Sequence, residues 1–159
     1  MKADEVRHLY EYHFRANRKL WDECVMLLTQ EQFLQPSDYS MGSVRNQLVH
    51  LLNIDERWFS GMRGDALPDF LDPQPFENRD EIRAMWDAVE AKMREYLAAL
   101  TDEMLGKPLT EGDPFPLAQV LLHVANHGTD HRAQVLALLH QLGVKTFPQD
   151  YFYFMIGRL

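Results

Sequence analysis

The sequence has a single cysteine and no long uninterrupted hydrophobic run. With only Cys24, no disulfide framework can form within the chain. None of the apolar runs reaches the ~18–20 residues that a helix needs to cross a bilayer. The first ten residues, MKADEVRHLY, are charged from the second position on and lack the apolar centre of a secretory signal. We therefore expect a soluble, cytoplasmic protein with no membrane partner.

Basic residues are also few, since 16 lysines and arginines face 24 aspartates and glutamates, for a net charge of −8. An acidic surface repels phosphate backbones, and no basic stripe interleaved with aromatic residues is present. We therefore expect no nucleic-acid partner. The length of 159 residues, with 46% hydrophobic and 25% charged residues, is typical of one globular domain. We expect a single domain over residues 1–159.

Strand-like alternation is nearly absent, whereas four segments have apolar residues three or four positions apart, as in amphipathic helices. Asp4 is a candidate N-cap of the first segment, and Asn78 of the third, with Glu81 completing a capping box. Pro116 suits the first position of the fourth helix, and Gly143 suits its C-terminal cap. The predicted helices cover residues 4–28, 43–62, 78–100 and 116–142.

An internal repeat relates the two halves of the chain. LTQEQF at 28–33 resembles LTDEML at 100–105, and QLVHL at 47–51 resembles VLLHV at 120–124, both at an offset of 72 or 73 residues. Each half reads as a helical hairpin that is too apolar on one face to stand alone. The sequence therefore predicts an all-α four-helix bundle built from two helical hairpins. We expect the aromatic tail YFYFMIGRL to pack back onto this bundle.

Three histidines follow one another in the fourth helix, at His123, His127 and His131. Because an α-helix turns ~100° per residue, they line one side, and the last two fall on the apolar face. Burying an imidazole without partners costs roughly 1–3 kcal/mol. A metal ion bound by both rings would satisfy them, as residues at i and i+4 do in zincin helices. The alternative is a histidine pair bonded to neighbouring helices; Gly128 between them indicates room for a neighbour or a ligand.

The motif HGTDH lacks the glutamate that serves HExxH proteases as a general base, which argues against a zinc protease of that type. Asp130 is expected on the outside of the helix. A third ligand has to come from another helix, and the repeat points to His50, at the edge of the apolar face of the second helix. Its counterpart His123 lies further from the apolar stripe than His131. We interpret His123 as a residue that supports a ligand or contacts a helix, with ligation as the alternative.

These residues resemble the DinB/YfiT-like family of metal-dependent enzymes, and the resemblance covers nearly the whole chain. Its strongest pieces are ANRKL at 16–20, GSV at 42–44 leading to His50, and HVANHGTDHRAQ at 123–134, where the family usually ends in HRGQ. The resemblance implies a four-helix bundle, a homodimer and a metal site with three histidine ligands, which match His50, His127 and His131 here.

Three imidazoles on a divalent ion leave coordination positions open, which is typical of catalytic rather than structural sites. Zinc and nickel suit imidazole nitrogen, and ferrous iron is an alternative. The resemblance extends to S-transferases and isomerases that use low-molecular-weight thiols, so we expect metal activation of a thiol and a small-molecule substrate. The alternatives are metal-assisted hydrolysis and a stress-associated protein that binds a metal or ligand without turnover.

Three other polar residues fall in or near apolar faces. Asp55 either orients a ligand histidine or a buried arginine, or lies at the rim of the core. Asn17 is expected to bond across helices. Cys24 shares its helix face with Trp21 and Leu28, so we expect a buried, unreactive thiol.

Overall fold

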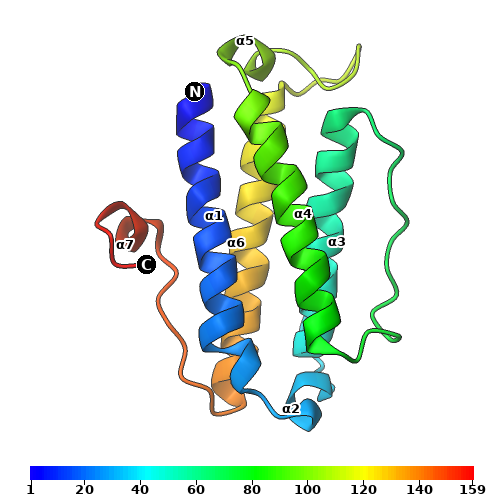
Figure 1. The fold of residues 1–159 in the computed structure, drawn as a ribbon, viewed down its shortest axis with the longest axis vertical. Coiled ribbons are helices and arrows are strands. Elements are labelled where there is room, and N and C mark those ends of the chain that lie inside the picture. Colours follow the sequence, from blue (N-terminus) through cyan, green and yellow to red (C-terminus); the bar gives the residue numbers. More distant parts are fainter.

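The four predicted segments form four long helices that lie side by side in a bundle (Figure 1). The computed structural model describes residues 1–159, and its regular elements are all helical. The elements are α1 Ala3–Glu23, the 3₁₀ turn η1 Val25–Leu27, α2 Gln30–Leu34, α3 Val44–Arg63, α4 Arg79–Ala99, α5 Asp102–Leu105, α6 Leu117–Gln141 and α7 Tyr151–Met155. The predicted all-α four-helix bundle is confirmed.

The two halves of the repeat interleave in the bundle. Helices α1 and α6 run in one direction, and α3 and α4 run in the other (Figure 1). Helix α3 packs against α4 and α6, and α1 packs against α6 and α4. Because α3 and α4 are parallel, the segment between them has to return along the whole bundle. Each helix therefore buries its apolar face chiefly against helices of the other half.

The short helices α2 and α5 bear out the repeat. The Thr29 hydroxyl accepts a hydrogen bond from the N–H of Gln32 at 3.2 Å, and the Thr101 hydroxyl accepts one from the N–H of Met104 at 3.3 Å. Each threonine thus satisfies one of the amides that a helix leaves free at its start. The two halves repeat the order of long helix, short capped helix and long helix.

The prediction that Asp4 caps the first helix is wrong. The helix begins at Ala3, whose N–H donates to Oδ1 of Asp102 at 2.7 Å. Asp4 lies within the first turn and pairs with Arg7 at 2.6 Å. Free amides at the start of this helix are thus satisfied by Asp102, far along the chain in α5, and locally by Glu5, whose Oε2 accepts from the N–H of Lys2 at 2.7 Å.

The first helix also ends earlier than predicted, at Glu23 instead of residue 28. Cys24 leaves the helical region with φ −129°, and η1 follows. Arg79 of α4 donates to the carbonyl oxygens of Val25 and Leu28. Carbonyls that a continued helix would bond internally thus find a partner in another helix.

The other predicted helix ends lie within one residue of the observed ones. Pro116 precedes α6 as its cap instead of opening it, and Gly143 follows α6 with φ +81°, as expected of a C-terminal glycine. Asn78 caps α4, but its side chain accepts from the N–H of Asp80 at 2.9 Å and forms no box with Glu81.

The aromatic tail packs back onto the bundle as predicted. Its helix α7 lies against α1, where the Tyr12 ring is 5.1 Å from the ring of Tyr151 and 5.8 Å from that of Phe154. The Tyr12 hydroxyl donates to the carbonyl oxygen of Gln149 at 2.6 Å. The C-terminal segment is thus anchored beside the middle of α1.

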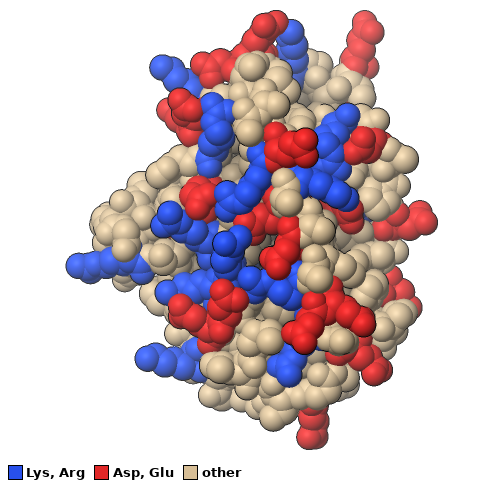
Figure 2. Space-filling view, viewed as in Figure 1, with Lys and Arg blue, Asp and Glu red and all other residues tan.

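Charges of both signs alternate on the face that α1 and α4 present in Figure 2. Arginines here pair with carboxylates across the two helices: Arg18 with Glu90 at 2.8 Å, and Arg94 with Glu11 at 2.9 Å. Exposed pairs of this kind stabilise a protein by only about 0–1 kcal/mol each. None of the helices is both long and apolar enough to span a membrane.

Candidate metal centre

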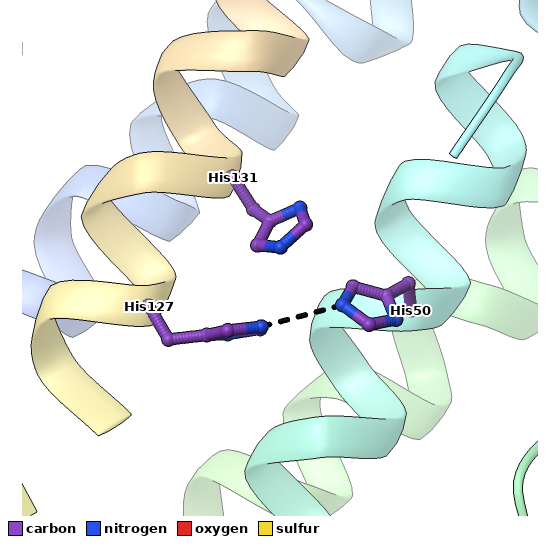
Figure 3. A group of neighbouring side chains, drawn as sticks. All are labelled: His50, His127 and His131. Carbon is purple, nitrogen blue, oxygen red and sulfur yellow. Dashed lines mark hydrogen bonds between the residues drawn. The ribbon is translucent and has the colours of Figure 1, made fainter. Parts of the chain in front are cut away.

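Three histidines from two helices converge between α3 and α6 (Figure 3). His127 and His131 are one turn apart on α6, and His50 faces them from α3. The Nε2 atoms of His50 and His127 are 3.3 Å apart, and one ring nitrogen from each of the three lies within 4.8 Å of the others. The structure thus brings together the three residues that were predicted from the sequence as candidate metal ligands.

The three rings are held in their neutral form. Burial, and then the positive charge that His131 can carry, lower the pKa of His50 and of His127 from 6.5 to about 4. Burial also lowers the pKa of His131. At neutral pH each ring therefore offers a nitrogen lone pair, which is the form in which imidazole binds a metal ion. Three neutral nitrogens at this spacing fit a divalent ion such as zinc or nickel.

The lowered pKa values predict that acid destabilises the metal-free protein. In the unfolded chain these histidines gain protons near pH 6.5, whereas folded His50 and His127 do so only near pH 4. Between these values the unfolded state binds more protons, so the free energy of unfolding falls as the pH falls from about 6.5 to about 4. Urea unfolding at a series of pH values, in the presence of a chelator, measures this slope.

The control for this experiment is a variant with both His50→Gln and His127→Gln, in which the remaining histidines still titrate. We expect the stability of the variant to depend less on pH than that of the parent over the same window. Parallel pH profiles for the two proteins would contradict the assignment of the slope to these rings.

The outer nitrogens of His127 and His131 have different surroundings. Nδ1 of His131 is 3.0 Å from Oε1 of Gln47, a residue of α3 that is fully buried. Nδ1 of His127 is buried and has no hydrogen-bond partner in the protein. Sequence reasoning missed Gln47, although a polar residue on the buried face of α3, three positions before His50, was a usable signal.

His123 lies outside the group of three. Its ring packs edge-to-face on Trp58 of α3, with centroids 5.4 Å apart, and its centroid is 6.3 Å from that of His127. Of the readings that the sequence left open, contact with a neighbouring helix is the one that the structure shows.

Asp55 is buried, with 4% of its surface exposed, so the rim position is wrong. Its Oδ2 is 3.1 Å from Nε2 of His13, and Nδ1 of that ring is 3.2 Å from Nη1 of Arg132. Arg132 is fully buried, and its Nη1 also donates to Oδ1 of Asn17 at 2.8 Å. Asp55 therefore reaches a buried arginine, but through His13, which sequence reasoning missed. Asn17 bonds across helices as expected.

Gly128 is the point at which His13 approaches α6. A Cβ atom at this position would lie 2.4 Å from Cε1 and 2.7 Å from Nδ1 of the His13 ring. The neighbour whose presence the glycine indicated is thus a histidine of α1, which lies against the backbone of α6 between His127 and His131.

The Gly128→Ala substitution is therefore expected to destabilise the protein by about 1–3 kcal/mol, the usual cost of overpacking a core. The His13 ring cannot move aside, because it is buried between Asp55 and Arg132. Gly61→Ala in α3 is the matched control: its Cβ would meet only Cδ2 of Leu67, at 3.4 Å. That change is expected to be neutral or to stabilise by up to ~1 kcal/mol, because alanine favours helices. Equal effects in urea unfolding would contradict this account.

Comparison with known proteins identifies the family of this chain. The DinB family model matches residues 1–157. The chain is 31% identical to Protein DinB of Bacillus subtilis, over 94% of this chain and 92% of that protein. It is also 27% identical to the uncharacterized protein YkkA of the same organism, over 60% of this chain and 64% of that protein. A family match along nearly the whole length, together with the first of these relatives, shows that this chain belongs to the DinB family.

Proposed function

We propose that this protein binds one divalent metal ion through His50, His127 and His131 and uses it in a reaction on a small molecule. The observation that carries this proposal is the convergence of three neutral imidazoles within 4.8 Å. Structural zinc sites are normally closed by four protein ligands, whereas three protein ligands leave a position for a substrate or water. The three rings are only partly buried, so a small molecule can reach them.

The reaction we propose is transfer of a low-molecular-weight thiol to an electrophilic carbon. The thiol sulfur forms a bond to the carbon, the leaving group departs with its electron pair, and the thiol proton passes to solvent. When bound, the ion would lower the pKa of a coordinated thiol, as it does for water. The three histidines would hold and orient this ion, because they come from two packed helices.

The thiol has to be supplied from outside the chain. Cys24, the single cysteine, is 1% exposed, and its Sγ is 3.6 Å from the carbonyl oxygen of Lys145. Burial raises the pKa of this thiol, which keeps it protonated. An inert cysteine in the core, as the sequence indicated, supports a small thiol as a co-substrate.

Metal-assisted hydrolysis and metal binding without turnover are the alternatives. The convergent group contains three imidazoles and no carboxylate, and Asp55 is engaged by His13. Without a carboxylate base, hydrolysis would depend on the ion alone to deprotonate its attacking water. This feature favours thiol transfer over hydrolysis, because a thiol loses its proton more readily than water does.

The test is a screen of small thiols with electrophilic substrates, using zinc- or nickel-loaded protein and following loss of free thiol. We expect turnover that depends on the metal and disappears in the His127→Ala variant. Turnover that persists unchanged in the variant would contradict the proposal. Loss of ester or amide substrates without thiol would favour hydrolysis, and a loaded but inactive protein would favour binding alone.

A further inference from the structure

A network of hydrogen-bonded side chains leads from the ligand His131 to the surface of α6. Nδ1 of His131 is 3.0 Å from Oε1 of Gln47, and Nε2 of Gln47 donates to Oε1 of Gln134 at 3.2 Å. Nε2 of Gln134 donates in turn to Oδ2 of Asp130 at 3.1 Å. This network crosses from α6 to α3 and back, and it ends at the carboxylate of Asp130.

The carboxylate fixes the direction of every hydrogen bond in this network. An amide can present either its oxygen or its nitrogen, but an ionised carboxylate can only accept. Asp130 therefore requires the NH₂ group of Gln134, whose oxygen is left facing Gln47. That oxygen requires the NH₂ group of Gln47, whose own oxygen then faces the imidazole of His131. An oxygen at this place accepts only from a ring that carries its proton on Nδ1.

Ser40 also contacts this network, and its hydroxyl, which can donate or accept, fits the same direction. Its hydroxyl donates to Oε1 of Gln134, the atom that also accepts from Gln47. Ser40 has φ +52° and is the one non-glycine residue with a positive φ, a conformation that costs about 1–3 kcal/mol. The segment before α3 therefore adopts an unfavourable backbone conformation where it contacts this network.

We propose that Gln47 is a positioning residue of the metal centre, which Asp130 orients through Gln134 so that His131 keeps its proton on Nδ1. The Nε2 lone pair of His131 is then free for the ion before any ion binds. The inference rests on the proposed metal site, because a tautomer preference matters only where Nε2 has a ligand role. Metal-binding histidines commonly have such an outer partner, and its loss costs 10–100-fold in affinity.

The test is the tautomer of His131 in metal-free protein, read from ¹⁵N chemical shifts of the ring nitrogens above pH 7. We expect the Nδ1–H form in the parent protein. In Gln47→Met, which removes the acceptor but keeps a similar volume, the ring should shift toward Nε2–H. Asp130→Asn is a surface substitution whose amide can donate or accept, so it no longer fixes the orientation of the Gln134 amide. Both tautomers of His131 should then be populated. His50 and His127 are internal references in the same spectra.

Asn53→Leu is the matched control, since Asn53 is buried on the same helix and bonds the 69–71 segment instead of a ligand. This variant should leave the His131 tautomer and the metal affinity unchanged. Gln47→Met should weaken zinc binding, measured by competition with a chelator, by 10–100-fold.

An Nε2–H form of His131 in the parent protein would overturn the proposal even if Gln47→Met failed to fold. An unchanged Nδ1–H form in Asp130→Asn would overturn the role of that carboxylate. Because these spectra contain neither metal nor substrate, they separate failure of this inference from failure of the proposed function.

Discussion

Replacing His127 by alanine is expected to remove the stabilisation that metal gives to this protein. A ligand present at a thousand times its dissociation constant stabilises the folded state by about 4 kcal/mol. His127 provides one of three nitrogens and lies 3.3 Å from another, so its loss leaves only two protein ligands. Thermal unfolding with and without zinc or nickel should show a large metal-dependent rise in Tm for the parent protein and none for the variant.

His123→Ala is the matched control for this experiment. It removes a histidine from the preceding turn of the same helix, but that ring packs on Trp58 and lies outside the convergent group. The variant should keep the metal-dependent rise in Tm. If His123→Ala abolished the rise while His127→Ala preserved it, the assignment of ligands would be wrong.

The second large effect is expected from Arg132→Met. Arg132 is fully buried and contacts His13, Asn17, Thr129 and Gln149 through its guanidinium nitrogens. Its positive charge offsets the negative charge of Asp55, which lies on the other side of the His13 ring. Removing one partner of a buried charge pair typically costs about 3–5 kcal/mol, because the other charge stays buried without compensation. Urea unfolding of the metal-free protein measures this loss.

A surface arginine serves as the comparison for Arg132. Arg18→Met breaks an exposed ion pair with Glu90 and is expected to cost at most about 1 kcal/mol. Adding Asp55→Leu to Arg132→Met should cost less than the sum of the two single changes, since the double variant leaves no unpaired buried charge. Additive losses would show that the two charges do not compensate each other.

Much of the architecture follows from the sequence because helical periodicity is a strong signal over twenty residues. The four long helices and the repeat that relates the two halves were predicted. The cap at the start of α1 and the residue at which α1 ends were not, because distant groups take part in both. Asp102 supplies the cap at Ala3, and Arg79 satisfies the carbonyls after Glu23. Local signals are insufficient where an end is completed by another helix.

In the candidate site, too, local sequence patterns predict some residues, whereas others are recognised only from packing. The spacing of His127 and His131 places both on one face of a helix, and the repeat together with the family resemblance adds His50. The residues that hold these rings in place were missed. His13 and Gln47 lie on other helices, and only packing shows that one meets Gly128 and the other meets His131. Periodicity predicts which face a polar residue occupies, but it does not predict its partner.

The most direct test of a three-histidine metal centre is elemental analysis of protein purified without an affinity tag or a chelator, beside the His127→Ala variant. We predict one divalent ion per chain in the parent protein and none in the variant. Absence of metal from the parent protein, even after zinc or nickel is supplied, would contradict the account. The three rings would then be a histidine cluster between helices, and the proposed reaction would have no basis.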